Sequence, residues 1–204
     1  MFAVDEENEH NQPSVNLCNA VEENTFYHII IFDSTNVSRA KDSIVAHEFE
    51  HVVLQEKKFP VTFDTRRDYN FISRQLINLM EDPLIYPKLK SYFNVEEDLI
   101  MNVEGLKAQI RRDGLFLHGI YRATNSFCCA RAHLMQRAFY EEDDHLGFYG
   151  FINDIIPEVI PEIDYIINIF EKNNYNTPEK QTRILEELTQ HYHLLDYVRI
   201  KTIP

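Results

Sequence analysis

The pattern of apolar and polar residues predicts a mostly helical protein with a small sheet near its N-terminus. The clearest strand covers residues 25–32, a run rich in aromatic and β-branched residues that ends at the turn-forming run Asp33-Ser34-Thr35-Asn36. Leu17 and Val21 predict a shorter partner element before it. Because the chain has only 5 glycines, a turn-rich all-β fold is disfavoured.

Apolar residues at helical spacing predict helices over most of the remaining chain. Their approximate ranges are 38–57, 68–82, 96–111, 126–141, 148–170 and 178–197. Ser38 is expected to cap the first helix. The second should end before Pro83, because proline disfavours α geometry at the preceding residue. Pro157 and Pro161 predict that the fifth range forms two short helices or one broken helix.

The last predicted helix has a capped start and one apolar face. Thr177 is placed as its N-cap, and Pro178 occupies its first position, where a missing N–H costs nothing. Its apolar stripe is expected to lie in the core and consists of Leu185, Leu188, Tyr192 and Leu195.

Inside the first predicted helix, His47, Glu48 and His51 form an HExxH motif. Four residues along an α-helix turn about 400° and rise about 6 Å, so the two histidines lie on one face and can bind one ion. Glu48 is placed to take a proton from a metal-bound water and return it to a leaving group. The flanking residues are apolar: Ile44, Val45, Val52 and Val53. The motif therefore predicts a zinc site with hydrolytic chemistry, against the alternative that the histidines only pack or form hydrogen bonds.

Two histidines do not complete a catalytic zinc site, which typically has three protein ligands and an open position. The strongest candidate for the third ligand is Glu81, thirty residues after His51 and at the expected end of the second helix. A carboxylate among apolar neighbours is costly to bury unless it is paired or binds a cation. Asp82 is the alternative, either as the ligand itself or as an acceptor that orients a histidine.

A strand, an HExxH helix and a later helix bearing glutamate together resemble the zincin metallopeptidases, and specifically their glutamate-ligand branch, the gluzincins. The resemblance covers roughly residues 25–90 and implies a zinc-dependent hydrolysis of peptide bonds. It implies that His47 and His51 bind zinc, that Glu48 is the catalytic base and that Glu81 is the third ligand. Asp82 stands where thermolysin-like enzymes have asparagine.

Zincins also use a Tyr, His or Arg side chain to stabilise the oxyanion that forms during peptide hydrolysis. His118, Tyr121 and Arg122 are candidates, because they lie close together beside Gly119, which indicates a turn near a pocket. The alternative is that they are surface polar residues beside a helix junction.

Composition and charge restrict the partners. The net charge is −13, from 33 acidic and 20 basic side chains, which disfavours nucleic acid and anionic membranes as partners. The 3 cysteines include the adjacent pair Cys128-Cys129, which is no framework for a stapled secreted domain. Without a secretion signal or a long apolar run, the chain is predicted to be soluble and cytoplasmic.

The sequence therefore predicts an α+β fold, a mostly helical zincin-like domain with a small N-terminal sheet. Residues 1–14 are expected to be a flexible acidic lead-in. Residues 15–204 are expected to form one domain, with a metal-binding core at 15–95 and a helical subdomain at 96–204. The expected partner is a peptide or protein substrate, and the oligomeric state stays open. The rival hypotheses are a non-catalytic, zinc-stabilised protein-binding module and a metal-free helical interaction protein.

Overall fold

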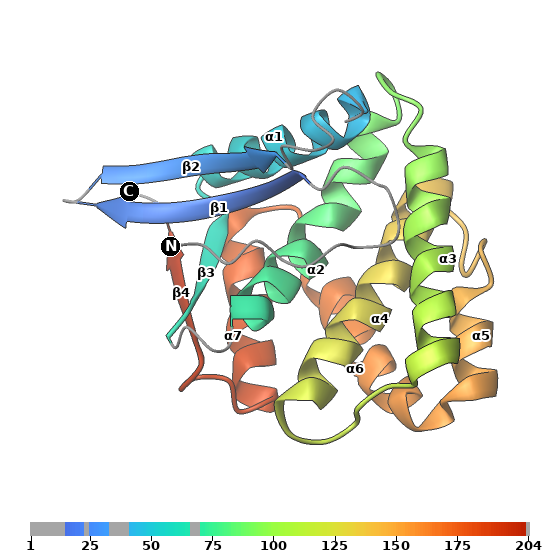
Figure 1. Ribbon diagram of the computed structural model, residues 1–204. Coiled ribbons are helices and arrows are strands. Elements are labelled where there is room, and N and C mark those ends of the chain that lie inside the picture. Colours follow the sequence, from blue (N-terminus) through green and yellow to red (C-terminus); the bar gives the residue numbers. More distant parts are fainter. Residues whose placement is uncertain (1–14, 23–24, 33–40, 66–69, 203–204) are drawn as a thin grey trace.

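A computed structural model of the chain describes residues 15–22, 25–32, 41–65 and 70–202 (Figure 1). In the described ranges the protein is mostly helical, with two small antiparallel sheets, which confirms an α+β fold in this coarse sense. The elements in chain order are β1 (Val15–Glu22), β2 (Thr25–Phe32), α1 (Asp42–Glu56), β3 (Pro60–Asp64), α2 (Asn70–Leu89), α3 (Glu96–Asp113), α4 (Gly119–Tyr140), α5 (Phe148–Ile155), the 3-10 helix η3 (Pro157–Val159), α6 (Ile160–Asn173), α7 (Pro178–His191) and β4 (Val198–Thr202). The predicted lead-in 1–14 and the expected cap Ser38 lie outside the described residues.

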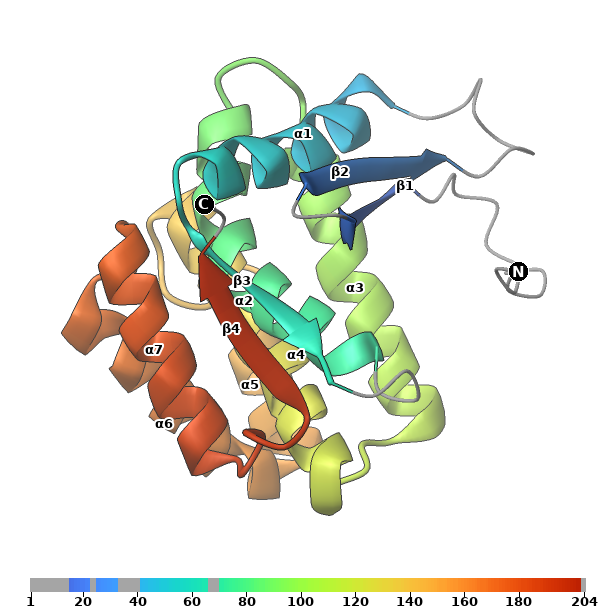
Figure 2. The same cartoon turned by 90° about the vertical axis from the view of Figure 1, so that its left-hand side faces the viewer.

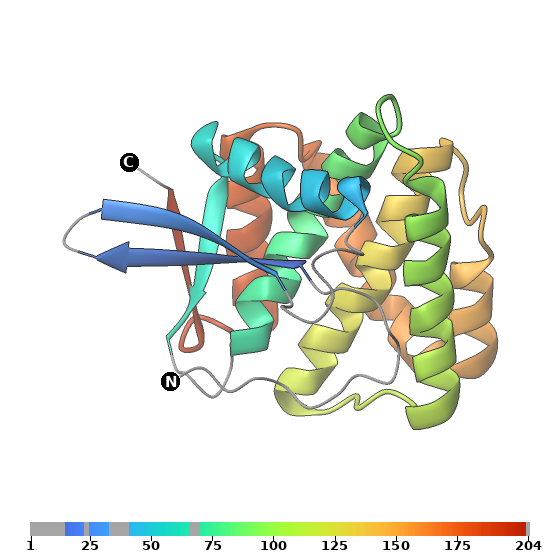
Figure 3. The same cartoon turned by 45° about the horizontal axis from the view of Figure 1, so that its top comes forward.

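The strands β1 and β2 form the predicted N-terminal hairpin. They pair antiparallel along their whole length, with Leu17 opposite Ile30. The hairpin lies alongside α1, and β1 is in contact with that helix (Figures 1 and 3). Both the predicted strand at 25–32 and its partner element are confirmed.

A second sheet, β3 paired antiparallel with β4, was not predicted. Figure 2 shows this pair beside α7, and its strands contact α2 and α7. The predicted last helix extended to residue 197, but α7 ends at His191 and a turn then leads into β4. Leu185 and Leu188 are buried as expected, whereas Leu195 lies beyond the helix end and is 65% exposed, so its assignment to the core was wrong.

The prediction that the second helix ends before Pro83 was also wrong. Helix α2 continues through Pro83 and Pro87 to Leu89. The helix is the centre of the core, where burial of apolar side chains outweighs the hydrogen bond that each proline removes. The Gln181 side chain also donates to the carbonyl of Met80, three residues before the first proline. As a result, residues 81 and 82 lie inside a helix and not at its end.

Of the remaining helices, α3, α5 and α6 follow the prediction closely, and α4 is longer than predicted. Helix α3 lies at the expected place. The apolar segment 148–170 is broken before Pro157 into α5 and the pair η3 and α6, and Pro161 lies in the first turn of α6. Helix α4 begins at Gly119, whereas the pattern predicted a start near residue 126. The segment taken for a turn near a pocket is therefore the first turn of this helix.

A single hydrophobic cluster joins the elements on both sides of residue 95. Helix α2 lies at its centre and packs against α1, α4 and β3, while α4 also packs against α6. Among the described residues, no helix is both long and apolar enough to cross a membrane. Helix α1 lies over α2, and this contact positions the candidate site (Figures 1 and 3).

Candidate metal centre

The HExxH motif lies in the middle of α1, on the side that faces α2. His47 and His51 are separated by one helical turn, and their rings meet edge to face with centroids 4.8 Å apart. Glu81 and Asp82 lie opposite them, inside α2. His51, Glu81 and Asp82 are all buried, while His47 is half-buried and is the most accessible of the four.

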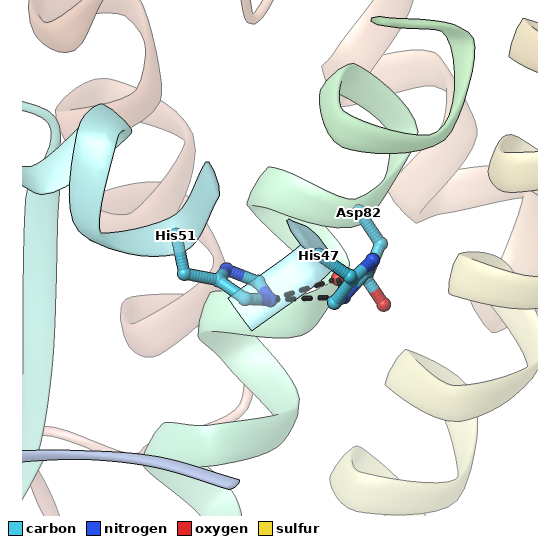
Figure 4. A group of neighbouring side chains, drawn as sticks. All are labelled: His47, His51 and Asp82. Carbon is cyan, nitrogen blue, oxygen red and sulfur yellow. Dashed lines mark hydrogen bonds and ion pairs between the residues drawn. The ribbon is translucent and has the colours of Figure 1, made fainter. Parts of the chain in front are cut away.

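Three side chains converge on one point, as Figure 4 shows. The Nε2 atoms of His47 and His51 are 3.1 Å apart, and Asp82 Oδ1 lies 3.3 Å from the first and 3.4 Å from the second. In a tetrahedral zinc site, ligand atoms about 2.0–2.1 Å from the ion lie about 3.3–3.4 Å from one another. The three atoms therefore form a nearly equilateral triangle with the size of one face of such a site.

A second observation supports a metal ion at this point. Asp82 Oδ1 is buried and has no hydrogen-bond partner among the described residues. A buried carboxylate oxygen is costly unless something compensates its charge, and a cation bound between it and the two imidazoles would do so. The group of His47, His51 and Asp82 could thus hold one metal ion.

Glu81, the expected third ligand, lies on the other side of His51. Its Oε2 atom is 2.5 Å from His51 Nδ1, the ring nitrogen that points away from the converging atoms. A carboxylate at this position fixes the ring orientation and the tautomer of a metal-binding histidine. The structure therefore brings Asp82, and not Glu81, to the two Nε2 atoms, and it places Glu81 where it orients His51.

The pKa values of the group are set by burial and by close contacts between its carboxylates and imidazoles. Burial alone would lower the pKa of His51, but its contacts with Asp82 and Glu81 prevail and raise that pKa to about 10. Burial acts to raise the pKa of Asp82, yet its contacts with the two histidines and with Arg131 hold it well below its usual range. Burial raises the pKa of Glu81, and His51 offsets this only in part. Without a metal ion, a proton on His51 provides the positive charge.

Arg131 and Tyr86 also reach the group, and the sequence analysis missed both. Arg131 of α4 places Nη1 3.5 Å from the other oxygen of Asp82, Oδ2. Tyr86 lies one turn after Asp82 on α2, and its ring meets that of His47 with centroids 5.1 Å apart. The spacing between residues 82 and 86 could have indicated Tyr86, but no local pattern points to Arg131.

Glu48 follows His47 on α1 and is half-buried. On a helix, consecutive residues point about 100° apart, so Glu48 lies beside the histidine face and not on it. This is the relation between the general base and the two ligands that the motif requires.

The structure does not bring the proposed oxyanion residues to this group. Tyr121 lies ten residues before Arg131 on α4, which corresponds to about 15 Å along the helix axis. His118 and Tyr121 are exposed, and Tyr121 stacks against Phe71. Arg122 forms an ion pair with Glu162 on α6. These residues occupy the first turn of α4, at the end of that helix distant from α1 (Figure 1).

Comparison with known proteins adds no further assignment. No family model, no curated protein and no solved structure matches the chain. The function must therefore be argued from the side chains that converge between α1 and α2.

Proposed function

We propose that the protein is a zinc-dependent metallopeptidase in which His47, His51 and Asp82 hold the metal ion. The observation that carries the proposal is the triangle of donor atoms, with sides of 3.1, 3.3 and 3.4 Å. An octahedral ion such as Mg²⁺ at about 2.1 Å would bring neighbouring ligand atoms to about 3.0 Å, which is shorter than all three sides. Two imidazoles and one carboxylate are also a common ligand set of catalytic zinc.

The residues around the triangle have distinct tasks in this proposal. A bound zinc ion would supply a Lewis acid that makes an attached water more acidic and polarises a substrate carbonyl. Glu48 would accept a proton from the attacking water and pass it to the nitrogen of the departing peptide fragment. Glu81 keeps His51 in the tautomer that presents Nε2 to the ion. The proposal is thus zincin-like in its motif, with aspartate in place of the expected glutamate ligand.

The alternative is a zinc-stabilised helical module without catalytic activity. One observation favours it: the His51 and Asp82 side chains are only 5% and 6% exposed. Structural zinc sites are closed in this way, whereas catalytic sites keep one position open to water and substrate. The two functions differ in their need for Glu48, because a structural site requires the donors but not the base.

The test compares wild-type protein with Glu48→Gln and with a matched control, Glu50→Gln. Glu50 lies two residues further along α1, and its carboxylate pairs with Lys88. Zinc content is measured by elemental analysis, and hydrolysis is measured with a mixed peptide library and mass spectrometry. We expect all three proteins to contain one zinc ion, and we expect Glu48→Gln alone to lose hydrolysis.

Two results would contradict the proposal. Purified wild-type protein that binds no zinc would exclude both the peptidase and the zinc-stabilised module. Zinc-loaded wild-type protein without hydrolysis, or with hydrolysis that survives in Glu48→Gln, would exclude the peptidase mechanism and leave the structural site.

A further inference from the structure

We propose that Arg131 is a positioning residue that restricts Asp82 to binding the metal ion through one oxygen. This inference deepens the proposed function and rests on the metal centre described there. It assigns a task to the contact between Arg131 of α4 and Asp82, which the hydrolytic roles of His47, Glu48 and His51 leave unexplained.

The two oxygens of Asp82 face different partners. Oδ1 lies 3.3 and 3.4 Å from the histidine Nε2 atoms, whereas Oδ2 lies 3.5 Å from Arg131 Nη1. A carboxylate with both oxygens free can bind a metal ion through either one or both. Because the guanidinium lies against Oδ2, only Oδ1 is left for the ion.

Arg131 is itself held in place by a chain of contacts that returns to the first metal ligand. Its Nη2 donates to Asn102 Oδ1 at 3.1 Å, and Asn102 Nδ2 donates to Tyr86 Oη at 3.4 Å. The ring of Tyr86 lies edge-on against His47. Four helices, α1 to α4, therefore contribute to one closed set of contacts around the site. An arginine fixed in this way cannot follow the carboxylate if Asp82 rotates.

The ion pair between Arg131 and Asp82 lies mostly out of water. The side chains are 17% and 6% exposed, in contrast to ion pairs of this protein such as Arg112–Asp113, with 69% and 46%. Exposed pairs contribute little because water and salt screen them, while a buried pair keeps its direction and much of its strength. The contact is therefore suited to holding the orientation of a ligand.

Loss of this contact has a specific consequence for coordination. With two imidazoles, one carboxylate oxygen and one water, a bound ion would be four-coordinate. If Oδ2 were free, it could join Oδ1 and raise the coordination number to five. Cobalt(II) distinguishes the two states, because four-coordinate tetrahedral cobalt absorbs visible light more strongly than five-coordinate cobalt does.

The experiment uses the full chain loaded with cobalt(II), in wild type, Arg131→Met, Arg131→Lys and the control Arg137→Met. Arg137 lies on the same helix but pairs with Asp143 and Glu171 at the surface. We expect Arg131→Met to lose visible absorption per bound cobalt. Arg131→Lys should recover part of that absorption, and Arg137→Met should resemble wild type. If Arg131→Met does not fold, Asn102→Leu takes its place in the test. This variant keeps the Arg131 charge but removes the side chain that holds the guanidinium, and its cobalt spectrum should lie between those of four- and five-coordinate cobalt.

The outcomes separate this inference from the proposed function. An unchanged spectrum per bound cobalt in Arg131→Met would overturn the inference, even if the variant melts at a lower temperature. The same unchanged spectrum in Asn102→Leu would overturn it if Arg131→Met does not fold. Wild-type protein that binds cobalt but hydrolyses no peptide would contradict the peptidase and leave the inference standing. Wild-type protein that binds no cobalt would overturn both.

Discussion

The sharpest prediction compares two substitutions at neighbouring residues, Asp82→Asn and Glu81→Gln. Each replaces one carboxylate with an amide of the same shape, so each removes one negative charge from the same buried region. The two variants differ in the role of the group that they change. Asp82 presents Oδ1 to both Nε2 atoms, whereas Glu81 reaches only the far nitrogen of His51.

The size of each effect follows from the distances. Removal of a group that orients a metal-binding histidine typically costs about 10–100-fold in metal affinity, or about 1.4–2.8 kcal/mol. A ligand atom lies about 2 Å from a zinc ion, whereas the His51 ring and its hydrogen bond place the Glu81 charge about 6 Å away. Because Coulomb energy falls with distance, Asp82→Asn should lose about three times as much zinc-binding free energy as Glu81→Gln. That loss is at least about 4 kcal/mol, or 1,000-fold in zinc affinity.

Zinc affinity of the two variants and wild type is measured by competition with a coloured chelator, and circular dichroism checks that each protein is folded. We expect the order wild type, Glu81→Gln, Asp82→Asn, with a gap of at least about ten-fold between the two variants. The reverse order would refute the assignment of Asp82 as ligand and return Glu81 to that place. Equal losses would mean that the site responds to net charge alone.

Three further predictions concern metal and pH. Zinc at about 100 times its Kd should stabilise the protein by about 2.7 kcal/mol and raise its Tm by about 5–10 °C, an increase that a chelator reverses and that Asp82→Asn abolishes. Because the pKa of His51 is raised to about 10 in the metal-free protein, zinc must displace its proton. Zinc affinity should therefore rise about ten-fold for each unit by which the pH is increased toward 10. Calorimetry in buffers of different ionisation enthalpy should detect the released proton. Burial lowers the pKa of His133, so the folded protein favours the neutral imidazole. The stability that this contributes is complete above the unfolded-state pKa of about 6.5. It declines, by at most about 1.4 kcal/mol per pH unit, as pH falls through the lower folded-state pKa. Urea unfolding of His133→Gln should therefore vary less between pH 7 and pH 5 than that of wild type, and equal pH dependence in the two proteins would contradict this assignment.

The features that the sequence predicted are those set by neighbouring residues. His47 and His51 lie on one face because of helical spacing, which needs no knowledge of the rest of the fold. The pairing of β1 with β2 is similarly local, since two residues separate the strands. The end of α5 before Pro157, and the place of Pro161 in the first turn of α6, follow from the geometry of proline itself. Each of these predictions depended on a few adjacent positions.

The features that were missed depend on contacts between distant segments. Strand β3 is stable because it pairs with β4, more than 130 residues later, and neither strand has an isolated pattern that predicts it. Helix α2 passes through Pro83 because its apolar residues fill the core, a tertiary effect that outweighs the local preference. Arg131 reaches Asp82 only because α4 packs against α2.

The exchange of roles between Glu81 and Asp82 has the same physical origin. The sequence placed both residues at a helix end, where side-chain directions are loosely defined. Since α2 continues past Pro83, the two residues keep helical phase and point about 100° apart. The longer glutamate reaches Nδ1 on one side of the His51 ring, and the shorter aspartate meets Nε2 on the other. In the proposed metal centre, one turn of one helix thus supplies both a ligand and the group that orients another ligand, which neither residue could do alone.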